Sequence, residues 1–317
     1  MKRLWAFKCL AIAALLCQAR AQNEQCSRCH PREAAAHAAT RHARALGRAS
    51  RSLFAEKLPD APIGEARGGY LLTYGVQGES LLVEARRGGD SATGVIDWVF
   101  GAGQQGQTPL MRVGSNFLEH RISYYPKTGR FDLTMGHRSG VSESAREALG
   151  QERSREEIER CLSCHATRIS ENLEPLIPGI QCVRCHPGAD EHARGRGRPL
   201  NPGQLDASSQ LAFCGNCHRS EVAAKDEQDP MNVRFQPLRL KMSRCFLSGG
   251  VSCTTCHTAH ADAIRGVPEY YNTKCLTCHP GQRENGNCLE CHMPRERPHP
   301  MLSFTDHYIR VVREPAR

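Results

Sequence analysis

The chain has 317 residues, 17 cysteines and a formal charge of +9 at pH 7. This length allows two domains of ordinary size, and the cysteine content excludes an ordinary reduced cytosolic enzyme. The positive charges are dispersed among acidic residues, apart from HARGRGRP at 192–199, which we interpret as a solvated loop, and no nucleic-acid-binding motif accompanies them.

The first 21 residues have the pattern of an export signal. A basic start (Lys2, Arg3) and an apolar stretch precede Ala19-Arg20-Ala21, a small-residue site suited to cleavage before Gln22. A transmembrane anchor fits less well, because Lys8 interrupts the apolar stretch and the remainder is short for a bilayer. We therefore expect a periplasmic or otherwise extracytoplasmic protein with no transmembrane segment after signal cleavage.

Three segments after this leader have clear local patterns. Residues 31–57 are rich in alanine and open with Pro31 at a first helical position, which predicts a helix. Residues 68–135 contain short apolar and aromatic runs separated by glycine, which predicts a β-meander. Residues 142–160 predict a polar helix with Ser142 as its cap.

The five-residue string C-x-x-C-H occurs seven times. One copy lies near the expected mature N-terminus, and six lie between residues 161 and 292. Every C-x-x-C pair in the chain is followed by histidine. The copies are CSRCH (26–30), CLSCH (161–165), CVRCH (182–186), CGNCH (214–218), CTTCH (253–257), CLTCH (275–279) and CLECH (288–292).

This string is the signature of c-type haem attachment. Two thiols three residues apart lie on one side of a helical turn, where they can bond to the two vinyl groups of one porphyrin, and the next imidazole reaches the iron as proximal ligand. Zinc sites, thioredoxin-type redox pairs and disulfides do not require a histidine after every second cysteine. We expect seven covalently bound haems c. The attachment residues are Cys26, Cys29, Cys161, Cys164, Cys182, Cys185, Cys214, Cys217, Cys253, Cys256, Cys275, Cys278, Cys288 and Cys291, and the proximal ligands are His30, His165, His186, His218, His257, His279 and His292.

Six haem motifs within 161–292 mean that porphyrins form much of the core there. The expected fold is therefore mainly α, with extensive loops wrapped around covalent c-type haems, plus a small haem-free β-meander module near residues 68–135. The expected domains are a signal peptide (1–21), an N-terminal helical segment with the first haem (22–60), a β-rich haem-free module (61–140) and a hexahaem cytochrome c domain (141–317). With two propionates per haem, the mature formal charge changes from about +5 to roughly −2 in the oxidised state.

Eight histidines lie outside the motifs, close to the number that a second histidine on each of seven irons requires. Short offsets after haem motifs favour His192 (CHPGADEH) and His260 (CHTAH) as distal ligands of neighbouring haems. His37 and His42 are about 140° apart around a helix and do not serve one iron. His120, in a predicted strand, is equally well explained as a β-surface residue. The eight are His37, His42, His120, His137, His192, His260, His299 and His307.

Two other residue types compete as ligands. Met242, Met293 and Met301 could replace a histidine, but packing explains them better. Cys245 lies outside the motifs, and a free buried thiol, an intermolecular disulfide and a ligand role stay open for it, with the first favoured.

Four stretches resemble the multihaem cytochromes c grouped as cytochrome c-552/4-like: CSRCHPREAAAHAATRHARAL, CVRCHPGADEH, SRCFLSGGVSCTTCHTAH, and CLECHMP followed by TDHYIR. That group is related to pentahaem nitrite reductase, hydroxylamine oxidoreductase and the tetrahaem acceptor of the latter. The resemblance implies His42, His192, His260 and His307 as distal ligands, followed by His137 and His299. The chain lacks the C-x-x-C-K site of typical nitrite reductases and any counterpart of the catalytic tyrosine arrangement of hydroxylamine oxidoreductase, which lowers the expectation of either activity.

We expect an exported seven-haem cytochrome that carries single electrons along closely packed, largely bis-His haems between donor and acceptor proteins. The alternative is a multihaem reductase of a small nitrogen or sulfur oxyanion at one haem with an open axial site, so enzyme activity stays open. A filament of stacked haem subunits is a third class, and an oligomer is compatible with the sequence. The eight-residue linker between the last two motifs predicts the shortest haem–haem separation there.

Overall fold

The computed structural model describes residues 25–65, 68–114, 116–281 and 286–312, so the predicted signal peptide lies outside the described residues. The chain divides into two compact units, Met1–Arg184 and Cys185–Arg317. The domain boundaries expected at residues 60 and 140 stay a prediction. Across the described ranges, no helix is long and apolar enough to cross a membrane.

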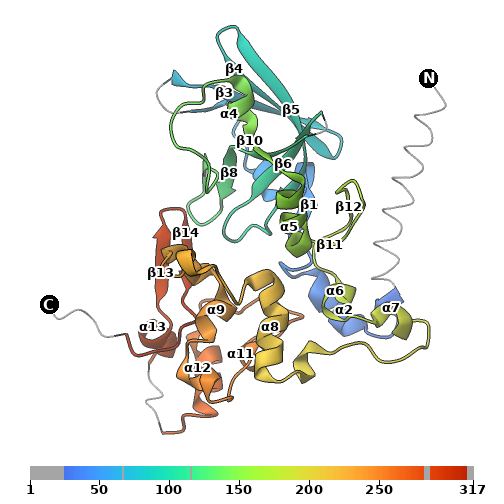
Figure 1. Ribbon diagram of the computed structural model, residues 1–317, viewed down its shortest axis with the longest axis vertical. Coiled ribbons are helices and arrows are strands. Elements are labelled where there is room, and N and C mark those ends of the chain that lie inside the picture. The colour runs from blue at the N-terminus through green and yellow to red at the C-terminus, as the bar shows by residue number, and fades with distance from the viewer. Residues whose placement is uncertain (1–24, 66–67, 115, 282–285, 313–317) are drawn as a thin grey trace, which may run out of the picture. The chain divides into compact units, whose positions relative to one another are not determined.

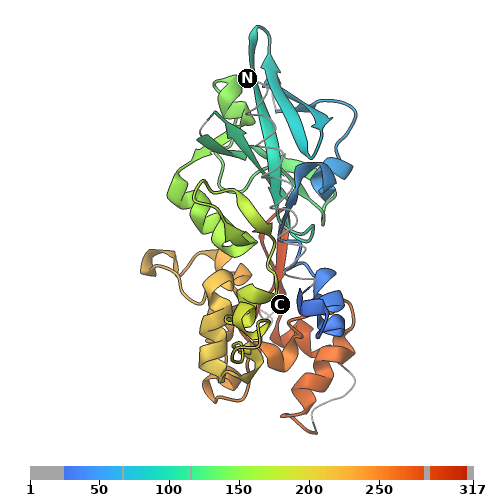
Figure 2. The ribbon, with the colours of Figure 1, turned by 90° about the vertical axis from the view of Figure 1, so that its right-hand side faces the viewer.

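The first unit is built on an eight-stranded antiparallel sheet (Figure 1). Its strands follow the order β10-β7-β6-β5-β4-β3-β2, and β1 also pairs with β5. From β3 to β7 each strand pairs with its chain neighbour, which makes a meander, coloured cyan to teal in Figure 2. The strands are β1 (Leu46–Arg48), β2 (Ile63–Gly64), β3 (Leu71–Gln77), β4 (Ser80–Arg87), β5 (Asp90–Phe100), β6 (Thr108–Val113), β7 (Asn116–His120) and β10 (Gly150–Arg153); separate hairpins are β8 (Ile122–Tyr125) with β9 (Arg130–Leu133), and β11 (Ala166–Ile169) with β12 (Pro175–Pro178).

Alternating apolar residues form this sheet because one face of each strand packs on a core. In β4, Leu81, Val83 and Ala85 are fully buried, whereas the side chains between them are more exposed. The two-residue turns on either side of β4 begin at Gly78 and Gly88, whose positive φ values of 63° and 58° suit tight hairpins. The largest buried members of this core are Phe54, Tyr70, Leu72, Leu81, Ile96, Met111, Leu118 and Leu149.

A bulge in β5 contributes to a second core. The register against β6 shifts between Ile96 and Trp98, so that Ile96 packs in the first core and Trp98 in another cluster. That cluster includes Ile158 and Leu162 of α5 (Arg155–His165). The helix that carries the CLSCH motif is thereby anchored to residues of the sheet.

The expectation of a mainly α fold is wrong. The structure is 33% helix and 26% strand, and its main feature is a large curled antiparallel sheet. The sheet is larger than the expected module at 68–135, because β1 and β10 also join it. These strands are only three and four residues long, and their pairing with β5 and β7 depends on distant partners that local sequence periodicity does not reveal.

The two helices expected in the first unit are shorter than predicted. α2 (Pro31–Ala38) begins at Pro31 as expected, but β1, a 3-10 turn and α3 (Leu53–Glu56) follow it. The segment 142–160 divides into α4 (Ala145–Leu149), β10 and α5, with caps at Ser144 and Ser154 rather than Ser142. Gly150 separates α4 from α5 because it lies against β7, where a Cβ atom would come 2.2 Å from the carbonyl oxygen of Glu119.

The second unit consists mainly of short helices and one hairpin, coloured yellow to red in Figures 1 and 2. Among the described residues, both hydrophobic clusters lie in the first unit, and the buried hydrophobic side chains of the second are Leu211, Val233, Leu240 and Leu302. α6 (Cys182–Cys185) spans the division between the units. The other elements are α7 (Ala189–His192), η3 (Pro202–Gln204), α8 (Ala207–His218), η4 (Ala224–Asp226), η5 (Pro230–Arg234), α9 (Gln236–Leu240), α10 (Arg244–Leu247), α11 (Cys253–Cys256), α12 (Pro268–Leu276), α13 (Cys288–His292), β13 (Arg295–His299) and β14 (Leu302–Thr305).

Candidate haem sites

The C-x-x-C-H motifs lie on helical turns or at helix ends. α5 and α8 end at the motif histidines His165 and His218, and α13 coincides with CLECH. In three other motifs the backbone N–H of the histidine donates to the carbonyl of the first cysteine, at 2.9 Å (His30) and 3.0 Å (His257 and His279). This bond closes one helical turn, so two thiols and one imidazole project from the same turn. The local backbone therefore fits attachment to a single porphyrin.

Three motif histidines have their Nδ1 atom held by a distant backbone carbonyl. His165 donates to the carbonyl of Ala45 at 2.8 Å, His186 to that of Leu200 at 2.9 Å, and His292 to that of Arg310 at 3.1 Å. Because a carbonyl oxygen can only accept a hydrogen bond, each of these rings carries its proton on Nδ1. A proton on Nδ1 leaves the lone pair on Nε2, on the far side of the ring, available to a metal. These three rings therefore have the tautomer that iron ligation requires.

Two histidines outside the motifs are oriented in the same way. His192, at the end of α7, donates from Nδ1 to Gly197 at 3.1 Å, and His307 donates to Thr305 at 3.0 Å. Both belong to the set of distal candidates chosen from the sequence.

Two pairs of histidine rings lie close together in the second unit. The ring centres of His186 and His260 are 6.0 Å apart at an interplanar angle of 30°, and those of His257 and His307 are 6.1 Å apart at 36°. Two imidazoles that share one metal ion, at about 2 Å per bond, have ring centres about 6 Å apart. Each pair therefore joins a motif histidine to a distal candidate at the spacing of two ligands on one iron.

The second of these pairs is also held in its neutral form. Desolvation lowers the pKa of His307 to about 4, and it lowers the pKa of His257 as well. A neutral imidazole is the form that binds a metal, so no proton has to be displaced at neutral pH.

Three further histidines outside the motifs have different partners. His120 is fully buried, and both of its ring nitrogens are hydrogen-bonded. Its Nδ1 atom lies 2.5 Å from the carbonyl oxygen of Leu149, and its Nε2 atom lies 2.8 Å from the hydroxyl of Tyr74. Desolvation lowers the pKa of His120 to about 4. His137, after β9, directs Nε2 to Glu119 at 3.1 Å. His299, at the end of β13, accepts at Nδ1 from the backbone N–H of Met301 at 3.2 Å.

Of the remaining candidates, His42 and His37 lie in the first unit and Cys245 lies in the second. The carbonyl of His42 accepts from the backbone N–H of Ile180 at 2.8 Å, which places this residue along the segment that follows CLSCH. His37 is buried in α2, and its carbonyl accepts from the hydroxyl of Thr40 at 2.7 Å. Cys245 is half-buried in α10, where desolvation raises the pKa of its thiol.

A buried glutamine that the motif pattern did not reveal joins the CGNCH and CTTCH motifs. Gln210, on α8, accepts from the backbone N–H of Thr254 at 2.8 Å and donates to the carbonyl of Pro202 at 2.8 Å. The thiols of Cys214 and Cys253 are hydrogen-bonded to each other, which raises the pKa of Cys214 and lowers that of Cys253. The first attachment cysteines of two motifs thus lie in contact.

A buried asparagine joins the last two motifs. Asn272, on α12, donates to the carbonyl of Gly286 at 2.6 Å and accepts from the backbone N–H of Cys288 at 3.2 Å. Burial raises the pKa of the Cys275 thiol, and the charge of Cys288 adds to this effect. Asn272, three residues before CLTCH, therefore connects the helix that leads into this motif with the start of CLECH.

Asp306 is a third side chain that sequence reasoning missed, although it directly precedes His307 in TDHYIR. Its carboxylate is 1% exposed and accepts from Arg239 at 2.7 and 2.8 Å and from Arg310 at 2.7 Å. Although desolvation opposes ionisation, these bonds hold the pKa of Asp306 below its usual range. The ion pairs tie the C-terminal segment that contains His307 to α9.

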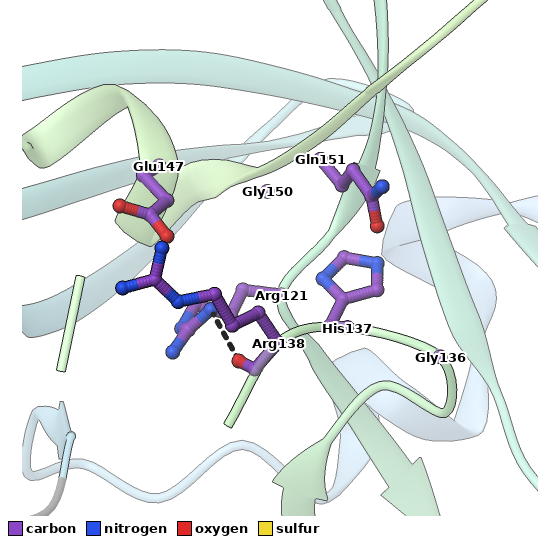
Figure 3. Close-up of a pocket in the computed structure, with 7 residues that line it drawn as sticks. All are labelled: Arg121, Gly136, His137, Arg138, Glu147, Gly150 and Gln151. Atoms are coloured by element: carbon purple, nitrogen blue, oxygen red, sulfur yellow. Dashed lines mark hydrogen bonds between the residues drawn. The ribbon is translucent and has the colours of Figure 1, made fainter. Parts of the chain in front are cut away.

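One cavity of about 430 Å³ lies in the first unit and is lined by His137, as Figure 3 shows. Two arginines also line it, but Arg121 is bound to Glu65 at 2.6 Å and Arg138 to Glu143 at 2.9 Å. Their charges are already compensated within the protein, so the lining gives no sign of an anion site.

Comparison with known proteins agrees with the motif geometry. Residues 128–187, which include two C-x-x-C-H motifs, match the family model described as cytochrome c554 and c-prime. A comparison with curated proteins finds no match.

A solved structure described as the outer cell wall cytochrome OcwA is also similar, at 15% identity and a TM-score of 0.41, over 89% of this chain and 64% of that one. The chain thus covers less than two thirds of that protein, and a likeness at this score supports no conclusion about fold or role. The relation to nitrite reductase and hydroxylamine oxidoreductase stays a prediction.

The small side-chain core of the second unit and the single-turn motifs fit covalent haem. Together with the match over residues 128–187, they support a c-type cytochrome that carries several haems and transfers electrons.

Proposed function

We propose that the protein is an exported seven-haem cytochrome that passes single electrons between redox partner proteins. The observation that carries this proposal is the repeated C-x-x-C-H turn combined with the two close histidine pairs of the second unit, His186 with His260 and His257 with His307. Each haem would supply a one-electron ferric/ferrous couple.

The residues that hold these groups divide into three roles. The fourteen motif cysteines form the thioether bonds, and the seven motif histidines are the proximal ligands. His260 serves the iron of His186, and His307 serves the iron of His257. His42 and His192 remain distal candidates for irons whose partners are not yet paired.

Close attachment sites support electron transfer along the second unit. Cys214 contacts Cys253, and Asn272 holds α12 against Cys288, so the step from the fourth to the fifth motif and the step from the sixth to the seventh are short. The prediction that the last two motifs have the shortest separation of all is still to be tested.

A haem count tests the proposal directly. We expect a pyridine haemochrome assay on the purified mature protein to give seven haems per chain, and its N-terminal sequence to begin at Gln22 in a periplasmic or other extracytoplasmic fraction. A Cys288→Ala/Cys291→Ala double variant is expected to give six. A wild-type value clearly below seven contradicts the proposal.

Reduction of a small nitrogen or sulfur oxyanion is a second candidate function. The observation that favours it is the engagement of His120, His137 and His299 by other groups, which reduces the supply of distal ligands. Steady-state assays with nitrite and sulfite, using reduced viologen as donor, are expected to show turnover if this function holds. No turnover above free haem rules it out for these two oxyanions.

A further inference from the structure

Two arginines of the second unit carry charges that no ion pair compensates. Arg219 directly follows His218 of the CGNCH motif, and Arg234 ends η5. Neither guanidinium forms an ion pair with a carboxylate among the described residues. By contrast, Arg239 on α9 is bound to Asp306 at 2.7 Å. Two positive charges left without a partner beside a haem motif indicate a site for an anion.

The two guanidinium groups lie beside the same aromatic ring. The Cζ atom of Arg219 is 4.9 Å from the ring centre of Phe235, and the Cζ atom of Arg234 is 4.6 Å from it. An aromatic face attracts a cation through its quadrupole and so holds both side chains in place. Since the ring has no net charge, both positive charges stay uncompensated.

Arg234 also has a donor without an acceptor. Its Nε atom is buried and has no hydrogen-bond partner in the part of the chain that the structure describes. Desolvation, followed by the like charge of Arg219, lowers the pKa of Arg234. The charge of Asp229 opposes this shift from beyond ion-pair distance, and its carboxylate accepts from the backbone N–H of Met231 at 2.8 Å. A buried charged donor is costly unless an acceptor meets it, so this side chain is suited to an anionic partner.

The backbone of Arg219 has an unusual conformation. Its φ is 54°, and among the described residues only Leu173 shares a positive φ without being glycine. The carbonyl of Arg219 accepts from the backbone N–H of Leu238 at 3.2 Å, which ties the end of α8 to α9 (Figure 1). This region of φ is costly for a residue with a side chain. The turn brings the residue that follows His218 beside Phe235.

A haem attached at CGNCH supplies two matching negative charges. Each haem c has two propionate carboxylates, and a guanidinium binds a carboxylate through a fork of N–H donors. Arg219 is covalently joined to His218, the proximal ligand expected for this iron, so the porphyrin lies next to the pair. Two unpaired arginines therefore fit the two propionates in number, charge and position along the chain.

We propose that Arg219 and Arg234 bind the propionates of the haem attached at Cys214 and Cys217. This inference rests on the proposed haem function. Both are positioning residues, since they hold the edge of the porphyrin rather than its iron. Positive charge at the propionates also disfavours the additional positive charge of ferric iron, so the pair raises the reduction potential of this haem.

Haem attachment at this motif is established first. Mass spectrometry of the proteolytic peptide that contains residues 214–218 is expected to show the added mass of one haem. A peptide without haem contradicts the proposed function at this motif and overturns the inference with it. When the peptide carries haem, the measurements that follow test the inference alone.

Removal of each charge tests the effect on the potential. In a potentiometric titration of the holoprotein, Arg219→Gln and Arg234→Gln are each expected to move about one seventh of the haem absorbance to lower potential, because one propionate loses its counter-charge. The control is Arg196→Gln, in the exposed pair with Glu191 at 3.5 Å, which is expected to leave the curve unchanged. A full haem content with unchanged curves in both test variants overturns the inference.

Lysine variants separate charge from packing. Arg219→Lys and Arg234→Lys keep the positive charge and are expected to retain a potential closer to that of the wild type. The propionate bending bands of the resonance Raman spectrum are expected to shift in the glutamine variants. If the lysine variants lower the potential as much as the glutamine variants do, the charge is not the cause, and the inference is overturned.

A soluble anion at the same arginines is distinguished by adding inorganic phosphate at constant ionic strength. Because the propionates already occupy the pair, we expect phosphate to leave the wild-type titration curve unchanged. A phosphate-dependent shift that is present in the wild type and lost in Arg219→Gln assigns the pair to a soluble anion and overturns the inference.

Discussion

Glu65 shows how a single carboxylate stabilises the first unit. Its side chain is 4% exposed and accepts from the Arg121 guanidinium at 2.6 Å, the Ser142 hydroxyl at 2.5 Å and the backbone N–H of Tyr70 at 3.0 Å. Although desolvation opposes ionisation, these bonds hold the pKa of Glu65 below its ordinary value. Its contribution to stability is therefore complete above the unfolded pKa of about 4.3 and is lost as the pH falls through the lower folded pKa.

Glu65→Gln is expected to lower the free energy of unfolding at pH 7 by about 3 kcal/mol, because it leaves the buried Arg121 charge uncompensated. The difference from wild type is expected to shrink as the pH falls below the unfolded pKa of about 4.3 toward the lowered folded pKa, where the wild-type carboxylate also loses its charge. Denaturant unfolding followed by circular dichroism at pH 7 and pH 3 measures both effects. The control is Glu143→Gln in the exposed pair with Arg138, for which about 0–1 kcal/mol is expected; equal losses in the two variants contradict the assignment.

Asp306 connects an ion-pair network to a proposed iron ligand. Asp306→Asn is expected to destabilise the second unit by about 3–5 kcal/mol, because two arginines lose a buried partner. The segment that contains His307 then loosens, and we expect high-spin character to increase in the ferric spectrum. Asp60→Asn, at an exposed position, is the control. An unchanged spectrum in Asp306→Asn, measured with the protein folded, would show that Asp306 does not position His307.

At the scale of elements, Gly150 lets β10 pair with β7. Its φ is 159°, and a Cβ atom there would come 2.2 Å from the carbonyl oxygen of Glu119 and 3.0 Å from the Cα atom of His120. The sheet partner of Gly150 is His120 itself. Only a residue without a side chain therefore lets α4 end and the next strand begin at this point.

Gly150→Ala is expected to cost about 1–3 kcal/mol of stability, because the strand must move away from β7. Gly89→Ala is the matched control, since a Cβ atom there would meet nothing within 4 Å. Thermal unfolding of both variants gives the comparison, and equal melting temperatures would show that the backbone at Gly150 adapts without loss. Hydrogen exchange at His120 and Glu119 locates the disturbance.

Element prediction from the sequence succeeded where the pattern was local. The start of α2 at Pro31 and the strands between residues 71 and 133 follow from residue type and alternation. The short strands β1 and β10 could not be predicted in this way. A segment such as Gly150–Arg153 has no strand pattern of its own and is extended only because β7 pairs with it.

At the scale of the molecule, the two units have different sources of stability. The first contains both side-chain clusters found among the described residues, whereas the second has only a few buried apolar side chains within its described ranges. Since a chain that buries little apolar area cannot offset its conformational entropy, we expect the second unit to depend on the proposed haems to fold.

Protein produced without haem attachment is therefore expected to keep the sheet of the first unit and lose the second. Hydrogen exchange read by mass spectrometry should show protected amides in β3 to β7 and rapid exchange throughout residues 185–312. The holoprotein is the reference, with protection expected in both units. Equal protection of residues 185–312 with and without haem would show that side-chain packing alone holds this unit together.

The amino-acid sequence by itself determined the seven C-x-x-C-H motifs and predicted haem attachment from them, because this chemistry depends on five consecutive residues whose identities carry the signal. The tertiary structure decided the fold class and the hydrogen-bond partners of the histidine rings. His165 donates to a carbonyl 120 residues away, and the partners of the His120 ring include Tyr74, 46 residues away. Which nitrogen holds the proton depends on such distant partners, and no local pattern in the chain contains them.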